Sequence, residues 1–293
     1  MRRSPFCPLN AKGDLAPGLN RETPFSFTGR VTCVTSMLYF QTSRPAPLTR
    51  NHTVKLLLRI LPLFVFATLF PVVSPAAAPH DAIKPVPRTG GWMTRHESFN
   101  ARVANGNADV LFIGDSITQG WEGRGKGVWA KFYGKRNTVN LGIGGDRTQH
   151  VIWRLDNGNV KNISPNAAVI MIGTNNSGSN SPEQIAEGVT VIVKQLREKL
   201  PKMKIILLAV FPRGENKADK RRQVNEGANA IFAKLDDGKS VFHLDIGEQF
   251  LEKDGTLTRE IMPDLLHLSE KGYTIWAESI EDKLSALLGE AKN

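Results

Sequence analysis

The chain has 293 residues, 41% of them hydrophobic and 23% charged, which fits one ordinary globular domain with an appendage. Its formal net charge is +10, but residues 1–76 hold nine Lys/Arg against two Asp/Glu, so residues 77–293 carry only +3. The positive charge is therefore a weak argument for nucleic-acid binding. Cys7 and Cys33 also precede residue 77, which excludes a disulfide, a cysteine nucleophile and a thiolate metal site from the rest of the chain.

The first recognisable segment is an apolar run, LLLRILPLFVFATLFPVV, at residues 56–73. Basic residues precede it, and small residues follow, with Ser74 and Ala76 placed for a signal-peptidase cut. This pattern predicts a leader over residues 1–76 that contains a signal peptide, and export to the periplasm or the exterior with no stable membrane insertion after cleavage. An uncleaved membrane anchor is the alternative, because the run is nearly long enough to span a bilayer.

The basic region before this run is unusually long for a signal peptide. A start at Met37 would give an ordinary length and would leave residues 1–36 untranslated. Residues 77–104 are first rich in proline and then polar, which predicts a linker and a lead-in with a short helix. The main domain is expected over residues 105–293.

Within the main domain, short β-branched runs alternate with longer helical patterns. The predicted strands are residues 109–114, 137–143, 167–173, 203–210 and 240–246. The predicted helices lie near residues 126–135, 147–157, 182–199, 216–236 and 269–288. The apolar runs show little polar alternation, as in strands of a parallel sheet that are buried on both faces. We therefore predict an α/β fold, a three-layer α/β/α sandwich around a five-stranded parallel sheet, with the site outside the carboxyl ends of the strands.

The loop after the first predicted strand contains Gly114, Asp115 and Ser116. Glycine permits a tight turn here, and a helix is expected to start near Ser116. A serine in this place is compatible with a helix cap, a phosphate contact or a nucleophile. The loop itself does not decide among these readings.

The next two loops offer hydrogen-bond donors. The second, at residues 142–147, has the pattern GxGGDR, which differs from the dinucleotide pattern GxGxxG and follows the second strand rather than the first. Its glycines allow backbone N–H groups to approach an anion closely. The third loop contains Asn175, whose amide either donates to a developing oxyanion or forms an Asx turn.

Asp264 and His267 precede the last predicted helix. A spacing of three on a turn lets the carboxylate reach the imidazole and fix its tautomer. The same pair could supply two metal ligands, but no HxH or HExxH accompanies it. His150 and His243 are predicted to be structural.

Four motifs in order, GDS, GIGGD, GTNN and DxxH, resemble the blocks of the SGNH (GDSL) hydrolase superfamily. The segments VLFIGDS, NLGIGGDRTQHVIWRLDNG, PRGE and DLLHLSEKGY are most similar to the branch formed by the catalytic subunits of platelet-activating factor acetylhydrolase Ib. The resemblance covers roughly residues 108–288. It departs from the family in GDSI for GDSL and in the leader, since the enzyme of that branch is intracellular. It implies a flavodoxin-like fold.

The resemblance also implies roles for individual residues. The implied catalytic residues are Ser116 as nucleophile, His267 as base and Asp264 as orienting acid. The implied oxyanion hole consists of the Ser116 and Gly145 backbone N–H groups and the Asn175 side chain. The implied borders of the acyl pocket are Ile117, Thr174 and Leu266. No metal or organic cofactor is required, and a homodimer is an open option because dimers occur in this family.

The resulting expectation is a serine esterase, a carboxylic ester hydrolase that acts on a small-molecule ester and does not bind nucleic acid. The Ile, Thr and Leu borders leave little room, which favours acetyl esters, and export makes acetylated carbohydrate a candidate substrate. A phospholipid or lysophospholipid acyl hydrolase and a thioesterase remain alternatives within the fold. A non-catalytic carbohydrate-binding protein, with Trp121, Trp129 and Trp153 as a sugar platform, is the alternative of another class.

Overall fold

The computed structural model describes residues 80–290, so the predicted leader with its signal peptide lies outside the described residues. Five parallel strands form one sheet in the order β2-β1-β3-β4-β5, which confirms the predicted fold class. The strands are β1 (Val110–Gly114), β2 (Thr138–Gly142), β3 (Ala167–Met171), β4 (Lys204–Leu208) and β5 (Val241–Leu244). Every residue of β1 and β3 is buried, as their uninterrupted apolar sequences predict.

Helices connect the strands at the predicted places. The α-helices of the described chain are α1 (Gly91–Ala104), α2 (Ser116–Gln119), α3 (Lys126–Tyr133), α4 (Thr148–Asp156), α5 (Pro182–Lys199), α6 (Lys220–Phe232) and α7 (Glu270–Leu288). The start of α5 follows from local chemistry, since the side chains and backbone of Ser181 and Gln184 form a capping box. Helix α7 begins after the cap Ser269 and ends at Gly289, which has a left-handed backbone.

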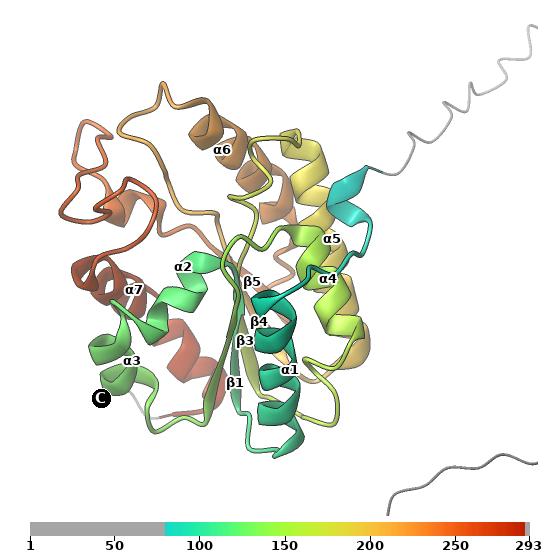
Figure 1. The fold of residues 1–293 in the computed structure, drawn as a ribbon. Coiled ribbons are helices and arrows are strands. Elements are labelled where there is room, and N and C mark those ends of the chain that lie inside the picture. Colours follow the sequence, from blue (N-terminus) through green and yellow to red (C-terminus); the bar gives the residue numbers. More distant parts are fainter. Residues whose placement is uncertain (1–79, 291–293) are drawn as a thin grey trace, which may run out of the picture. The chain divides into compact units, whose positions relative to one another are not determined.

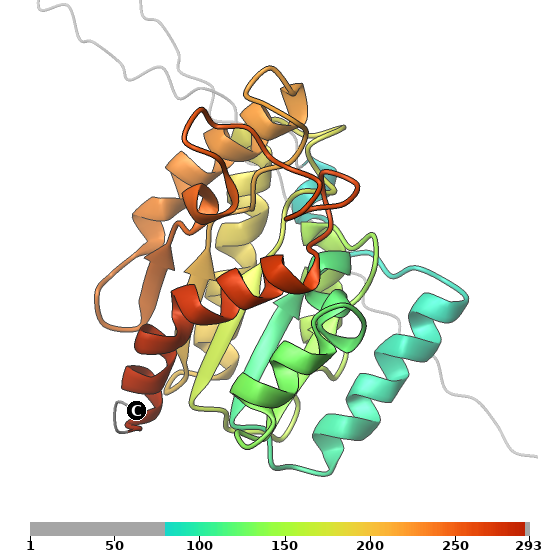
Figure 2. The ribbon, with the colours of Figure 1, turned by 90° about the vertical axis from the view of Figure 1, so that its left-hand side faces the viewer.

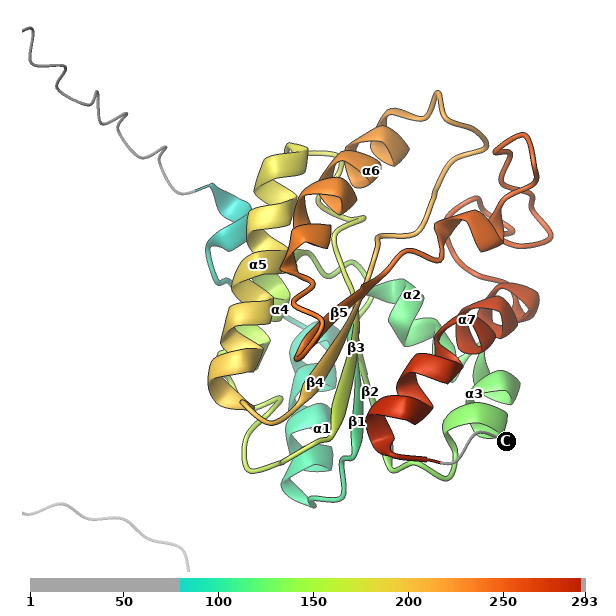
Figure 3. The same cartoon turned by 180° about the vertical axis from the view of Figure 1, so that it is seen from behind.

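The sheet separates two hydrophobic cores, and each is covered by its own helices. Figure 1 shows α1, α4, α5 and α6 on one face and α2, α3 and α7 on the other, and Figure 3 shows the same three layers from behind. Within β1, Leu111 and Ile113 enter the first core, whereas Val110 and Phe112 enter the second. Because β1, β3 and β4 contribute side chains to both cores, the centre of the sheet is fixed from both sides.

Helix α1 belongs to this packing and is more than a lead-in. Its Trp92, Phe99 and Val103 are buried in the first core beside residues of β1 and α4. The first core therefore includes residues that precede the expected start of the main domain at residue 105. The apolar residues of α1 are spaced along one helix face, a pattern that the proline-rich segment before them obscures.

The strand order determines where a site can form. The chain leaves β1 toward β2 on one side and later returns to place β3 on its other side, so the sheet has its switch point at β1. In open sheets of this type, ligands bind outside the carboxyl ends of the strands at that point. Figure 2 shows α2, α3 and α7 in front of the sheet, with the loop before α7 extending beyond the strand ends. Among residues 80–290, no helix is long and apolar enough to cross a membrane.

Candidate active site

The turn after β1 places Ser116 at the first position of the short helix α2. Asp115, and not Ser116, caps this helix: its carboxylate accepts a hydrogen bond from the Ile117 N–H at 2.9 Å. Gly114 is required at the end of the strand, since a Cβ there would lie 2.4 Å from the Met171 carbonyl oxygen. The Ser116 hydroxyl is thus free of a capping role, contrary to one of the readings of the sequence.

A hydrogen-bonded relay joins Ser116 to the turn before α7. The Ser116 hydroxyl donates to His267 Nε2 at 2.9 Å, and His267 Nδ1–H donates to Asp264 Oδ2 at 2.7 Å. The other oxygen of Asp264 accepts from the backbone N–H groups of His267 (2.7 Å) and Leu266 (3.2 Å). This turn requires a positive φ of 59° at Leu265. Ser116 and His267 are 151 residues apart in the sequence, and the structure brings them together with Asp264.

Asp264 is held as a carboxylate. Partial burial raises its pKa, but hydrogen bonds from the His267 side chain and backbone and from the Leu266 N–H outweigh that effect and lower the pKa to about 2. A carboxylate next to Nδ1 keeps the imidazole proton on that nitrogen and leaves Nε2 free to accept the serine proton.

Two backbone N–H groups next to the serine have no partner among the described residues. They belong to Ser116 and Gly145. Gly145 has a φ of +74°, which favours glycine, and its loop is fixed on both sides: Gly144 N–H donates to Gln119 Oε1 at 2.7 Å, and Arg88 donates to the Gly144 carbonyl at 2.8 Å. The glycine loop therefore presents a free donor on a fixed backbone.

The third predicted donor, Asn175, lies on the loop after β3. Its Nδ2 donates to the Asp146 carbonyl at 2.8 Å and has a second, weaker contact of 3.4 Å to Asp115 Oδ2. Asp146 is itself fixed by Arg154 and by Trp92, whose indole donates at 2.6 Å. The short hydrogen bond to Asp146 thus fixes the orientation of the Asn175 amide. The second amide hydrogen has only the weak 3.4 Å contact and is available to an oxyanion.

Asp115 is a buried acid directly beside the serine. Burial raises its pKa from 3.8 to about 7, and the nearby Asp146 adds to this effect, while the hydrogen bond from Ile117 and the charge of Arg213 oppose it. The sequence did not single out this residue for a role. Its partners, Ile117 N–H and Asn175, show that it organises the serine turn.

The three residues implied as borders of the acyl pocket each adjoin a residue of the relay or of the donor set. Ile117 and Thr174 are buried, with 1% and 2% of their surface exposed, and Leu266 is half-buried. Thr174 is held by two side chains, because its Oγ1 accepts from Arg213 at 3.1 Å and from Asn225 at 3.3 Å. The side chains of Ile117 and Thr174 are therefore surrounded by other protein atoms.

Arg213 lies in the loop after β4, where the sequence analysis named no functional residue. Its Nη1 donates to the carbonyl and hydroxyl of Thr174, and the next residue, Gly214, donates its N–H to the Leu265 carbonyl at 2.9 Å. This loop therefore connects the Asn175 loop to the turn of Asp264. In the sequence, the signal that could have identified Arg213 was the PRGE segment, which is part of the resemblance to the family.

The remaining candidates are structural. His150 Nδ1 accepts from the Arg147 N–H, and burial, together with the nearby Arg88, Arg147 and Arg154, lowers its pKa to about 4. His243 lies within β5, where burial lowers its pKa. Among residues 80–290, no group of three or more His, Cys, Asp or Glu is placed to hold a metal ion.

The three tryptophans considered as a sugar platform do not lie on the same side of the sheet. Trp121 is buried in the second core with Trp129 packed against it, whereas Trp153 packs against the first core. They therefore form no common surface.

Comparisons with known proteins identify the family of this chain and proteins that share its fold. Residues 112–275 match the GDSL-like lipase/acylhydrolase family. Platelet-activating factor acetylhydrolase IB subunit alpha1 of Homo sapiens is 36% identical over 221 residues, which cover 74% of this chain and 92% of that protein. The alpha2 subunit of Rattus norvegicus is 36% identical over 218 residues, 74% and 93% of the two chains. A GDSL-like lipase from Bacteroides thetaiotaomicron shares the fold, with a TM-score of 0.52, 19% identity, and coverage of 66% of this chain and 97% of that one.

Proposed function

This chain belongs to the GDSL-like lipase/acylhydrolase family and is a carboxylic ester hydrolase, and from that premise we propose that it cleaves acetyl esters through Ser116, His267 and Asp264. The observation that carries the proposal is the continuous relay from the Ser116 hydroxyl through His267 to Asp264, with hydrogen bonds of 2.9 and 2.7 Å. Such a relay is what nucleophilic catalysis by a serine requires.

The reaction proceeds in two halves. His267 Nε2 takes the proton of Ser116 as the hydroxyl oxygen attacks the ester carbonyl, and the new oxyanion is held by the Ser116 and Gly145 N–H groups and by Asn175. The C–O bond to the alcohol then breaks, and His267 returns its proton to the leaving oxygen. Water, deprotonated by His267, attacks the acyl-enzyme in the same way and releases the carboxylic acid. Asp264 stabilises the imidazolium in both halves.

The preference for acetyl esters follows from the walls of the site. Ile117 and Thr174 are packed against the protein, and Thr174 is fixed further by Arg213. A longer acyl chain would have to displace these side chains. We propose acetylated carbohydrate as the substrate class, in keeping with export through the predicted signal peptide, and N-terminal sequencing of the native protein would test the cleavage.

A Ser116→Ala variant tests the mechanism. It should lose turnover of p-nitrophenyl acetate and covalent labelling by an organophosphate, because both need the serine oxygen. Ser98→Ala is a matched control, since Ser98 is exposed on α1 and its hydroxyl donates to the Arg95 carbonyl of the same helix. Activity that survives in Ser116→Ala would reject the proposal. The wild-type protein should also cleave the acetate faster than the octanoate, and the opposite order would reject the acetyl preference.

A further inference from the structure

The glycine loop that follows β2 contains a tight turn over residues 143–146. The Asp146 N–H donates to the Ile143 carbonyl at 3.1 Å. Gly145, the third residue of the turn, has a φ of +74°, whereas Gly144 has no positive φ. This combination is characteristic of a type II turn. A Cβ on Gly144 would lie 3.9 Å from the Ser116 Cβ, so the turn lies directly beside the proposed nucleophile.

The central peptide of this turn decides whether an oxyanion donor faces the serine. It consists of the Gly144 carbonyl and the Gly145 N–H, which point in opposite directions because the peptide bond is planar and trans. Type I and type II turns differ by a rotation of this peptide of about 180°, and glycine at both central positions makes either turn sterically accessible. A rotated peptide would direct a carbonyl oxygen at the oxyanion in place of the N–H.

Arg88 is the hydrogen-bond partner of this peptide among the described residues. Its Nη1 donates to the Gly144 carbonyl at 2.8 Å. The bond from the Gly144 N–H to Gln119 holds the preceding peptide and does not restrain the central one. The guanidinium also covers the turn, because a Cβ on Gly145 would lie 3.2 Å from Nη1 and 3.5 Å from Nη2. Arg88 therefore opposes the rotation that would remove the Gly145 N–H from the site.

The charge of Arg88 acts in the same direction as its hydrogen bond. A cationic donor polarises the peptide whose carbonyl accepts from it, and the N–H of that peptide becomes a stronger donor to a negative charge. The same Nη1 lies 3.6 Å from Asp146 Oδ1, and the Asp146 carbonyl accepts from Asn175. Arg88 thus contacts the residue that orients a second oxyanion donor.

Arg88 comes from the proline-rich segment before α1, where the sequence predicted a linker. Pro85 and Pro87 restrict the backbone next to it. The carbonyl of Ala82 accepts from the Thr148 hydroxyl at 2.7 Å, which ties the segment to the start of α4. Figure 1 shows the segment, in cyan, passing beside α4 on its way to α1. The guanidinium therefore reaches the glycine loop from a segment that is fixed to the domain.

We propose that Arg88 is a positioning residue for the esterase reaction and holds the turn of residues 143–146 in the state that presents the Gly145 N–H to the oxyanion. The inference rests on the proposed function, since it requires an oxyanion formed at Ser116. It gives a residue before the predicted main domain an effect on the reaction rate.

Arg88→Ala tests this role with p-nitrophenyl acetate as the substrate. Loss of an oxyanion donor lowers kcat about 100- to 1,000-fold. The turn without Arg88 still samples the type II state, so we expect kcat to fall about 10- to 100-fold and KM to change less than about 3-fold. Arg88→Lys keeps a cationic donor and should retain more activity. Guanidinium chloride at a low, non-denaturing concentration should restore part of the kcat of Arg88→Ala, whereas it would worsen a defect of folding.

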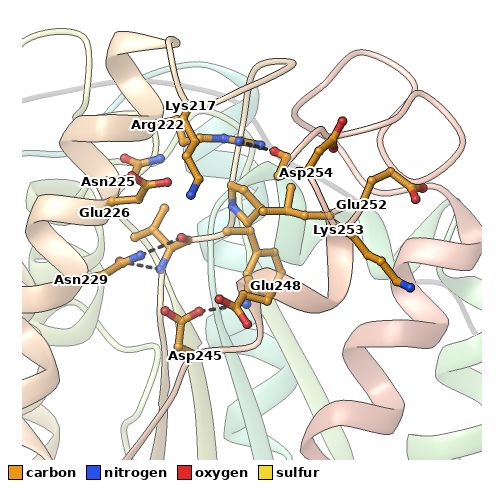
Figure 4. Close-up of a pocket in the computed structure, with 16 residues that line it drawn as sticks. Lys217, Arg222, Asn225, Glu226, Asn229, Asp245, Glu248, Glu252, Lys253 and Asp254 are labelled. Carbon is orange, nitrogen blue, oxygen red and sulfur yellow. Dashed lines mark hydrogen bonds between the residues drawn. The ribbon is translucent and has the colours of Figure 1, made fainter.

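Two control variants each remove one positive charge elsewhere. Arg102 is half-buried like Arg88 and donates to two backbone carbonyls, but these precede the amino end of β1. Lys217 lines a cavity between α6 and residues 245–255 that none of the relay or donor residues lines (Figure 4). Arg102→Ala and Lys217→Ala should both keep the kcat of the wild-type protein.

Thermal unfolding reports whether each variant is folded, and Arg88→Met, which preserves much of the side-chain length, replaces Arg88→Ala if that variant does not fold. A folded variant that keeps more than about a third of the wild-type kcat would overturn the inference. A loss of kcat that neither lysine nor guanidinium restores would also overturn it. Failure of the proposed function would look different, because turnover would then survive in Ser116→Ala.

Discussion

Replacing Asp264 with asparagine would separate two tasks of its carboxylate. One oxygen holds the turn by accepting from the backbone N–H groups of Leu266 and His267, and the other accepts from His267 Nδ1 at 2.7 Å. The amide oxygen of an asparagine can keep the turn. Its NH₂ group, however, would face Nδ1 as a donor and would force the proton of the neutral imidazole onto Nε2. His267 could then no longer accept the proton of Ser116.

The size of the loss depends on the exposure of the acid. In a serine protease whose acid is buried, this change lowers kcat about 10,000-fold. The side chain of Asp264 is 52% exposed, so water can replace the amide beside Nδ1 in part of the molecules. We therefore expect Asp264→Asn to lower kcat about 1,000-fold, which corresponds to about 4 kcal/mol of transition-state stabilisation.

Asp264→Ala is the matched comparison. It removes both backbone bonds of the turn, each worth about 1 kcal/mol, but leaves the imidazole free to adopt either tautomer. We expect this variant to have a melting temperature lower by several degrees than Asp264→Asn and an activity at least as high. Initial rates with p-nitrophenyl acetate and thermal unfolding in one buffer measure both quantities. An Asp264→Asn variant that retained more than a tenth of the wild-type kcat would refute the role of Asp264.

Three further changes test the surroundings of the serine. Asn175→Ala should lower kcat by about 100- to 1,000-fold with little effect on KM, whereas Asn176→Ala should mainly lower the melting temperature, because Asn176 is buried in a hydrogen-bond network around the start of α4. Gly145→Ala should lower kcat and stability together, since φ is +74° and a Cβ would lie 3.2 Å from Arg88, and unchanged kinetics would argue against its N–H as a donor. The pKa of Asp115 is raised from 3.8 to about 7, so its contribution to folding stability is present below about pH 4 and lost as the pH rises through about 7. Urea unfolding should accordingly show that Asp115→Asn gains stability relative to wild type between pH 5 and pH 8, and a constant difference would contradict the raised pKa.

Elements with local signals could be predicted from the sequence. The bounds of α5 follow from Ser181, Pro182 and the basic residues at its end, all within one turn of the helix termini. The strands follow from apolar runs that need no knowledge of their partners. Ser116 and His267 could be assigned together only because their motifs resemble a known family, since no local pattern relates residues so far apart.

Other features depend on contacts that a single segment does not reveal. Arg213 matters because its guanidinium reaches Thr174, 39 residues earlier in the chain, and nothing in its own loop indicates that partner. Asp115 replaces Ser116 as the helix cap because the strand delivers its carboxylate to the Ile117 N–H, although both residue types are good caps. Helix α1 was expected to be a lead-in because its buried face becomes recognisable only against the sheet.

The topology explains why the proposed oxyanion donors come from three different loops. Strands β2 and β3 flank β1 on its two sides, so the loops after them, with Gly145 and Asn175, converge on the serine from both directions. The base comes from the far end of the chain, where α7 returns across the second core. There the Tyr273 hydroxyl donates to the Ile117 carbonyl at 2.7 Å, so the helix that follows His267 is bonded directly to the helix that starts with Ser116. A Cβ at Gly120 would lie 2.0 Å from that hydroxyl, and glycine is therefore needed for this contact. The distance between nucleophile and base is thus supported both by this helix contact in the core and by the turn that carries Asp264 and His267.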